Sequence, residues 1–220
     1  MSLFFENIPE ATATILKTLA KEKFIKDFTL VGGTSLALQL GHRQSEDLDF
    51  IYDGEKIPSL NIKRNISTIF KNYKIIREET GFQIDFLIQG VKLKFFSTGA
   101  VIIPFKVMDF SFNYDFLRVA TVDIIAVLKM STIAQRCTIR DYYDLYYLAK
   151  NVLGLKEIFK SCKQLLPNLS AITYTETIVY VKDISENSLE EHLNPKEIAS
   201  KQQIADYFYQ QLKIIYKKVD

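Results

Sequence analysis

Residues 30–52 read LVGGTSLALQLGHRQSEDLDFIY, and this stretch decides the fold. The pattern predicts a short apolar strand over 28–31, a helix over 34–40 that ends at Gly41, a polar loop over 42–46 and a second strand over 47–52. The glycines at 32 and 33 let the backbone approach a ligand closely, and free N–H groups at the start of a helix can receive a phosphate. Taken alone, the pair also fits a tight strand-to-helix turn with Thr34 as the N-cap.

Two acids follow the glycines in this stretch. Asp47 and Asp49 are alternate residues of the second strand, so both carboxylates project from one face, about 6.7 Å apart along the strand. Neighbouring carboxylates repel each other unless a cation lies between them, and Mg²⁺ suits a site of few carboxylates, several waters and phosphate oxygens. The same pattern also fits two solvated acids on an exposed strand.

A third acid lies in a later apolar strand. Residues 82–89 predict a strand in which Asp85 faces away from Ile84 and Phe86. Asp is disfavoured in strands, so this position needs a reason. If the strand pairs beside the strand of Asp47, three carboxylates converge and can hold two metal ions ~3.5–4 Å apart. Otherwise Asp85 is a single acid on a solvated sheet face.

The rest of the chain predicts an α+β fold, in which a small mixed sheet with flanking helices precedes an all-helical half. In the first half we expect helices over 9–19 and 58–73, and strands over 74–78, 82–89 and 91–96. Residues 101–118 are aromatic-rich and aperiodic, and we expect them to cross between layers. In the second half we expect helices over 122–135, 139–151, 155–165, 170–182 and 195–218. We expect two domains, residues 1–115 and the helical residues 116–220, the second completing the cleft of the site.

Composition narrows the class of protein. The chain has 220 residues, a net charge of +2 and two cysteines without a CxxC spacing. These features are typical of a soluble globular protein in a reducing compartment, and they indicate neither a zinc site nor a disulfide framework. No stretch approaches the ~20 apolar residues of a membrane span, so we expect a cytoplasmic protein. The small net charge neither supports nor excludes a nucleic-acid partner.

The helical half holds a second group of polar residues. Lys129 shares the inward face of its helix with Ile125 and Ile133, so it must either snorkel to water or meet an anion, which could be a carboxylate or a triphosphate. Asp141 shares an inward face with Leu145. It could form a capping-box variant with Thr138, or an ion pair or shared site with Lys129. The tyrosines at 142, 143, 146 and 147 fit packing between helices, with stacking on a nucleobase as the alternative.

Together, Gly32-Gly33-Thr34, Asp47-Leu48-Asp49 and the later Asp85 resemble the DNA polymerase β-like nucleotidyltransferase superfamily. The longer segment GGTSLALQLGHRQSEDLDF resembles the abortive-infection toxin branch of this superfamily, the AbiEii/AbiGii-like proteins. The same branch has a Lys, an Arg and an Asp-x-x-Asp-Leu-Tyr signature, matched here by Lys129, Arg136 and the run RDYYDLY at 140–146. The resemblance covers roughly residues 25 to 150.

The resemblance implies a metal-dependent enzyme that transfers a nucleoside monophosphate from a nucleoside triphosphate to an acceptor and releases pyrophosphate. It implies that Asp47, Asp49 and Asp85 hold Mg²⁺ or Mn²⁺, and that Asp85 helps to deprotonate the acceptor hydroxyl. The expected nucleotide-binding residues are Gly32, Gly33, Thr34, Ser35, Arg43 and Lys129, and the expected catalytic residues are Asp47, Asp49, Asp85, Lys129 and Asp141. The family also implies a bacterial toxin with a partner antitoxin, and some members add nucleotides to tRNA.

Two other hypotheses remain open at this point. The acceptor could be a small molecule, such as an antibiotic, or a protein hydroxyl group. Alternatively, the fold could hold a nucleotide without turnover and act as a binding module. Transfer to tRNA would fall steeply with salt, because the release of counterions drives such binding.

Overall fold

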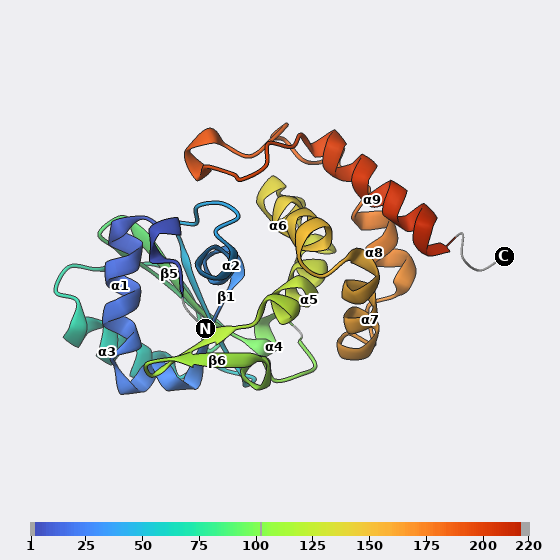
Figure 1. Cartoon of the computed structure of the whole chain (residues 1–220). Helices are drawn as coiled ribbons and strands as arrows, with labels where there is room; N and C mark the ends of the chain where they lie inside the picture. The colour runs from blue at the N-terminus through green and yellow to red at the C-terminus, as the bar shows by residue number, and fades with distance from the viewer. Residues whose placement is uncertain (1–2, 102, 217–220) are drawn as a thin grey trace. The chain divides into compact units, whose positions relative to one another are not determined.

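The computed structural model describes residues 3–101 and 103–216, and the chain divides into two compact units, Met1–Thr121 and Val122–Asp220. The described part of the first unit is a mixed sheet with helices (Figure 1). Its elements are η1 Phe5–Asn7, α1 Glu10–Ala20, η2 Lys23–Asp27, β1 Phe28–Val31, α2 Gly32–Leu40, β2 Leu48–Tyr52, α3 Ser59–Ile69, β3 Lys74–Glu79, β4 Gln83–Ile88, β5 Val91–Ser97, α4 Thr98–Val101, η3 Val107–Phe110, β6 Ser111–Tyr114 and β7 Leu117–Ala120.

The strand order places the chain's first two strands in the middle of the sheet. The order is β3-β4-β5-β2-β1-β7-β6. β2 pairs with β1 in antiparallel and with β5 in parallel orientation, while β1 also pairs in parallel with β7. β4 pairs with β3 and β5 and therefore does not neighbour β2. The segment that carries Asp49 thus lies at the centre of the sheet, with β5 between it and the strand of Asp85.

One face of the sheet is packed under helices. Alternate residues of β2, β4 and β5 point into a core that also contains the buried faces of α1 and α3, and Figure 1 shows both helices beside the sheet. The strand residues of this core include Leu48, Phe50, Ile84, Phe86, Leu93 and Phe95. Because side chains alternate along a strand, the residues between them face the other side, and these include all the polar side chains discussed below for β2, β4 and β5.

The stretch 101–118 differs from the expectation. Residues 111–120 form a hairpin of two short strands, β6 and β7, joined at Asp115, whose φ is +52°. Each strand has only four residues, too few to show a clear alternation, and β7 pairs with β1 from the start of the chain. This pairing keeps residues 116–121 with the sheet, so the contacts divide the chain at 121/122, whereas the sequence suggested 115/116.

The described part of the second unit is helical, as expected. Its elements are α5 Val122–Ile133, α6 Ile139–Asn151, α7 Leu155–Leu165, α8 Ala171–Thr177, η4 Glu191–Leu193 and α9 Lys201–Tyr216. α6 and α7 have the predicted bounds, whereas α8 is shorter and α9 begins six residues later than expected. The expected end of α9 at residue 218 lies outside the described residues. Ile204 and Phe208 on the inward stripe of α9 are both fully buried.

Candidate active site

The glycine pair forms the first turn of α2, directly after β1. Gly32 has a φ of +74°, a left-handed conformation that an L side chain rarely adopts. A Cβ on Gly32 would lie 2.9 Å from Oδ2 of Asp49, so the Asp49 carboxylate rests against the glycine backbone. A Cβ on Gly33 would collide with the guanidinium of Arg43 and lie 3.0 Å from Oγ of Ser45. The two glycines therefore leave room for one carboxylate and one guanidinium at the start of a helix.

The hydroxyl groups of Thr34 and Ser35 hold this turn in place through hydrogen bonds. The Thr34 hydroxyl donates to the Asp47 carbonyl and lies 2.9 Å from Oγ of Ser45, which fixes the loop that leads into β2. The Ser35 hydroxyl is fully buried and donates to the carbonyl of Ala120 at 3.0 Å. Ser35 thus anchors α2 to β7, and its hydroxyl points into the protein, away from the ligand position that the sequence suggested for it.

The strand expected over 47–52 begins one residue later, so that only Asp49 of the acid pair lies within it. Asp47 immediately precedes β2 and is exposed, while Asp49 is half-buried within β2 and pairs with Val31 at the end of β1. Arg43, predicted to neutralise phosphate charge, is 4% exposed and donates from Nη1 to the carbonyl of Gln44 at 2.8 Å. Its other terminal nitrogen, Nη2, lies beside Gly33. The first unit therefore brings Gly32, Gly33, Arg43 and the acid pair into one small region.

Asp85 lies on the same face of the sheet as Asp49, but β5 separates the two strands that carry these acids. Lys94 of β5 pairs in register with Asp49 on one side and with Asp85 on the other, and Asp85 pairs in turn with Arg77 of β3. Four neighbouring strands thus carry the row Asp49, Lys94, Asp85, Arg77, which we call the charge row. Two strand spacings of about 4.8 Å separate the backbones of the two acids. The pairing that would make all three acids converge is absent from the described sheet.

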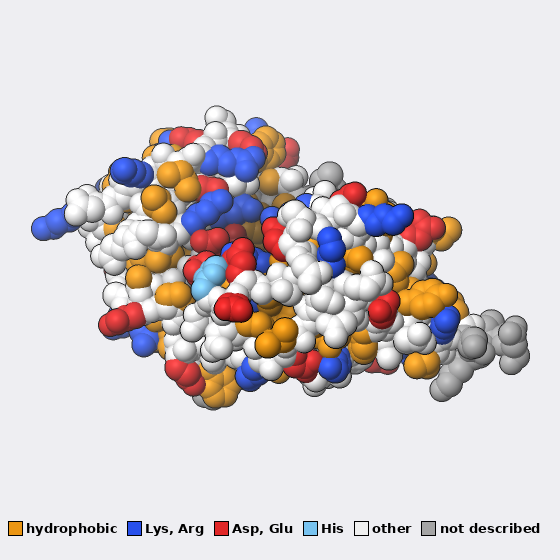
Figure 2. Space-filling view, turned by 90° about the horizontal axis from the view of Figure 1, so that it is seen from above, with side chains coloured by type: hydrophobic (Ala, Val, Ile, Leu, Met, Phe, Trp, Pro, Cys, Tyr) orange, Lys and Arg blue, Asp and Glu red, His pale blue; other side chains and the backbone are white. Residues whose placement is uncertain are grey.

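The Asp85 carboxylate is held by its own neighbours. It is 1% exposed, accepts a hydrogen bond from Nε2 of Gln83 at 2.8 Å and forms an ion pair with Nζ of Lys92 at 3.0 Å. A buried carboxylate needs such compensation, because burial without it is costly. The Lys94 ammonium instead lies over the Phe96 ring, 4.7 Å from its centroid. Of the two lysines of β5 on this face, Lys92 therefore contacts the carboxylate and Lys94 an aromatic ring. Figure 2 shows that Lys/Arg and Asp/Glu side chains are interspersed on one face of the molecule.

The acid pair fits a hard divalent cation. Its donors are the carboxylate oxygens of the exposed Asp47 and of the half-buried Asp49 beside Gly32, and Mg²⁺ prefers a few such oxygens together with water and phosphate. Within residues 3–101 and 103–216, no three His, Cys, Asp or Glu side chains cluster as a metal-binding group. The fit therefore rests on Asp47 and Asp49.

The second unit holds a buried ionic cluster on α5 and α6. Nζ of Lys129 lies 2.7 Å from Oδ1 of Asp141 and 2.5 Å from Oδ2 of Asp144, and all three side chains are at least nine-tenths buried. The other oxygen of Asp141 receives Nε of Arg136 at 3.0 Å and the hydroxyl of Thr138 at 2.7 Å. Of the alternatives that the sequence left open, the ion pair between an inward Lys129 and an inward Asp141 is the one present, and Thr138, the N-cap residue of α6, also contacts Asp141.

The same contacts set the protonation state of Asp141. Burial by itself would raise the pKa of this carboxyl, but the charges of Lys129 and Arg136 and the hydrogen bonds from Lys129 and Thr138 lower the pKa to about 2. Asp141 is therefore ionised at neutral pH and held in a fixed orientation. Its lysine partner meets carboxylates on α6, which is one of the two anions that the sequence left open.

The tyrosines of α6 pack between helices. Tyr142 and Tyr143 are fully buried, and burial raises the pKa of each, that of Tyr143 to about 12. The Tyr142 hydroxyl donates to the carbonyls of Thr177 and Tyr180, while the Tyr143 hydroxyl accepts the backbone N–H of Glu197. Neither ring is available for stacking on a nucleobase, so the packing interpretation holds for both.

Three side chains of these sites were missing from the sequence-based selection. Asp144 is the second acid of the Asp-x-x-Asp-Leu-Tyr signature but was not among the expected site residues, and its position one helical turn after Asp141 is the signal that could have identified it as a second partner for Lys129. Lys92 and Lys94 alternate with apolar residues in β5, which shows that they share a face but not which strand they adjoin.

In the part of the chain that the structure describes, no helix is long and apolar enough to cross a membrane.

The sequence and the fold both match known proteins. An Aquifex aeolicus (strain VF5) protein called aq_aa25 is 32% identical over 169 residues, which cover 75% of this chain and 79% of that protein. The crystal structure of JHP933 from Helicobacter pylori has a TM-score of 0.54 at 20% identity, and covers 96% of this chain and 94% of that one. MenT4, the nucleotidyltransferase toxin Rv2826c from Mycobacterium tuberculosis H37Rv, has a TM-score of 0.53 at 11% identity, with 91% and 84% covered.

At these identities, the two crystal structures establish the fold, a mixed sheet followed by a helical half. The family is shown by the sequence itself, because residues 14–213 match the family described as nucleotidyl transferase AbiEii toxin, type IV TA system. The match spans both units and includes the glycine turn, the acid pair and the ionic cluster of α5 and α6. The chain therefore belongs to the AbiEii family of nucleotidyltransferase toxins.

Proposed function

We propose that this nucleotidyltransferase moves a nucleoside monophosphate from a nucleoside triphosphate to a hydroxyl group of an RNA, with tRNA as the first candidate, and that the reaction depends on Mg²⁺. The observation that carries the proposal is the glycine turn, where the Asp49 carboxylate lies against Gly32 and the Arg43 guanidinium against Gly33. This turn offers a metal-binding acid, a fixed cation and helix N–H groups within one small region, and these are what a metal-bound triphosphate requires.

In the proposed reaction, an oxygen of the acceptor attacks the α-phosphorus, and the bond from this phosphorus to the oxygen that bridges to the β-phosphate breaks. Pyrophosphate leaves, and the acceptor proton passes to solvent. The residues of the chain position and neutralise the reactants, because little covalent work is required of the protein in such transfers. Arg43 and the first N–H groups of α2 face the phosphates, and Thr34 holds the Asp47 backbone through its carbonyl.

Asp47 and Asp49 would hold the metal ion, Mg²⁺ or Mn²⁺. When bound, the ion neutralises phosphate charge and favours the displacement. In this proposal Asp85 does not deprotonate the acceptor, since its carboxylate is bound by Lys92 and Gln83 and the strand of Lys94 lies between it and Asp49. Lys129 and Asp141 hold α5 and α6 together, and we propose this positioning role in place of direct phosphate contact.

The family also supports a biological role. Members are toxins of type IV toxin–antitoxin systems, and MenT4 is named as a nucleotidyltransferase toxin. We propose that this chain acts in the cytoplasm as such a toxin, and that a cognate antitoxin protein counteracts it. Co-expression with the gene next to its own should relieve growth arrest caused by the chain but not by an unrelated toxin. No relief would contradict this part of the proposal.

The transfer itself is tested by incubating the purified chain with each α-labelled triphosphate, Mg²⁺ and total tRNA. The control is the variant Asp47→Ala/Asp49→Ala, with folding checked by circular dichroism. Label that enters RNA only with the native chain, and only without EDTA, supports the proposal. Label in a small molecule or in protein would move the acceptor to another class. No transfer to any of these acceptors, with no metal-dependent triphosphate binding, would refute it.

A further inference from the structure

Lys94 occupies a special place on the sheet, directly beside the acid pair. It pairs in register with Asp49 on β2, and the glycine turn lies on the opposite side of Asp49, toward β1 and α2. In the proposed function, a metal-bound triphosphate would occupy the side of the glycines, where Arg43 lies. The acceptor would then approach from the side of β5, where Lys94 is the residue in register with Asp49.

The charges alternate along the charge row away from Asp49. Lys94 is followed by Asp85, whose charge is balanced by Lys92, and then by Arg77, whose exposed guanidinium forms an ion pair with Glu79. Lys92 keeps its ion pair with Asp85, whereas the Lys94 ammonium rests on the face of the Phe96 ring. A cation–π contact of this kind holds an ammonium in place at a modest free energy and leaves its N–H groups able to bind an anion.

We propose that Lys94 is a positioning residue for the acceptor, and that it binds a phosphate of the RNA backbone next to the reactive hydroxyl. The proposal rests on the proposed function and adds a determinant of acceptor choice to it. An ammonium beside Asp49 attracts a polyanion and repels a cationic acceptor, such as an amine-rich antibiotic, through the same charge. Asp85 then serves to hold Lys92 beside Lys94.

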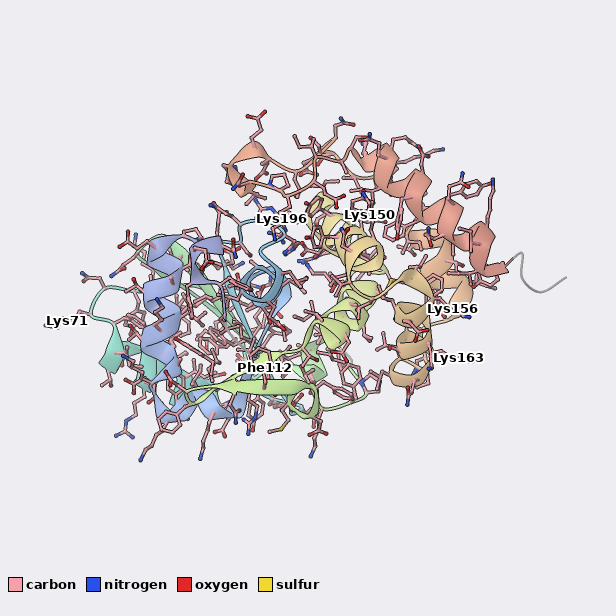
Figure 3. All side chains as sticks on the ribbon, viewed as in Figure 1. Lys71, Phe112, Lys150, Lys156, Lys163 and Lys196 are labelled. Atoms are coloured by element: carbon pink, nitrogen blue, oxygen red, sulfur yellow. The ribbon has the colours of Figure 1, made fainter. Side chains whose placement is uncertain are left out.

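The test compares Lys94→Gln, Lys94→Arg and the matched control Lys71→Gln, which removes an exposed positive charge from the connection between α3 and β3 (Figure 3). Binding of a fluorescent single-stranded RNA oligonucleotide with a free 3′ hydroxyl is measured by anisotropy over a range of salt concentrations. Binding of the Mg²⁺ complexes of ATP, GTP, CTP and UTP is measured separately by calorimetry. These equilibrium measurements do not depend on turnover.

We expect Lys94→Gln to weaken RNA binding roughly tenfold and to reduce the slope of log affinity against log salt by about one, with triphosphate binding unchanged. Lys94→Arg should keep most of the RNA affinity, and Lys71→Gln should resemble the native chain. In the transfer assay, Lys94→Gln should raise the KM for RNA more than it lowers kcat. These shifts would not follow from a role in packing alone.

Three results would overturn the proposal: equal RNA binding by Lys94→Gln and Lys71→Gln, a loss of triphosphate binding in Lys94→Gln, or no RNA binding by the native chain. The proposed function is judged separately, by label transfer in the native chain against the Asp47→Ala/Asp49→Ala control. A native chain that transfers label to RNA while Lys94→Gln binds RNA normally would remove Lys94 from the site and leave the proposed function intact.

Discussion

The carboxylate of Asp49 rests against the backbone of Gly32, so that a Cβ on this glycine would lie 2.9 Å from Oδ2. Gly32→Ala should therefore have two effects. The φ of +74° strains an alanine by about 1–2 kcal/mol, and the new methyl group displaces the Asp49 carboxylate. We expect nucleotidyl transfer to fall at least about a hundredfold, because a shift of about 1 Å in a reacting geometry costs that much.

The matched control for this change is Gly90→Ala, at φ +83° in the turn between β4 and β5, where a Cβ would meet nothing within 4 Å. It should lower the free energy of unfolding by a similar amount, measured by urea denaturation, and leave transfer close to native. If both variants lose transfer equally, backbone strain alone is responsible and the contact with Asp49 is irrelevant.

A comparison of Asp49→Asn with Asp85→Asn distinguishes the roles of these two acids in nucleotidyl transfer. Loss of a metal ligand removes several kcal/mol of transition-state stabilisation, so Asp49→Asn should reduce kcat/KM for transfer about a hundredfold to a thousandfold. Asp85→Asn keeps the size of the side chain and its position next to Gln83, and should retain transfer within about tenfold. Steady-state kinetics on both variants measure these changes in kcat/KM. An equal loss of kcat/KM in the two variants would mean that Asp85 also belongs to the metal site.

The ionic cluster of α5 and α6 makes a prediction about stability. Lys129→Met leaves the buried carboxylates of Asp141 and Asp144 without their shared lysine, which should cost about 3–5 kcal/mol. Unfolding in urea can be followed by tyrosine fluorescence, since most tyrosines of the chain lie in residues 122–220.

The control is Lys150→Met, which removes the partly exposed ion pair with Glu197 and should cost at most about 1 kcal/mol. Figure 3 labels Lys150 on α6. Similar losses in the free energy of unfolding of the two variants would mean that the buried Lys129 cluster stabilises the fold no more than the partly exposed ion pair does.

The lowered pKa of Asp141 predicts how stability depends on pH. Because the folded pKa of about 2 lies below the ordinary value of 3.8, this carboxylate stabilises the fold above pH 4 and loses that contribution as the pH falls toward 2. The contribution is on the order of 2 kcal/mol. Denaturation at pH 7, 4 and 3 should show a smaller acid-induced loss for Asp141→Asn than for the native chain. Identical pH profiles would show that Asp141 is not the group that titrates.

Local sequence patterns predicted the elements that have strong local signals. β1, α6 and α7 have the expected bounds, and Gly41 ends α2 in the left-handed conformation that a helix C-terminus often requires. The hairpin of β6 and β7 was missed, because Asp115-Phe116 is not a typical turn pair and the partner strand β1 lies far away in the chain.

The site was predictable where it depends on spacing and not where it depends on strand order. The alternation of Asp47 and Asp49 and the glycine pair are local, so the sequence placed them together. The position of Asp85 depends on β5 lying between β4 and β2, a parallel pairing between distant segments that no local pattern reveals. The same pairing made Lys94 a neighbour of Asp49, although its sequence context resembles any exposed lysine in a strand.

The hydrogen bond from the Thr34 hydroxyl to the Asp47 carbonyl joins two residues that lie 13 positions apart in the chain. It closes the segment between them into a ring, with the glycine turn at one end and the acids at the other. Lengthening a closed loop costs little, about 0.6 kcal/mol for each doubling of its length. Relatives can therefore gain or lose residues in this connection while the glycines and acids keep their places, and across the family the closure should persist more faithfully than the number of residues that it encloses.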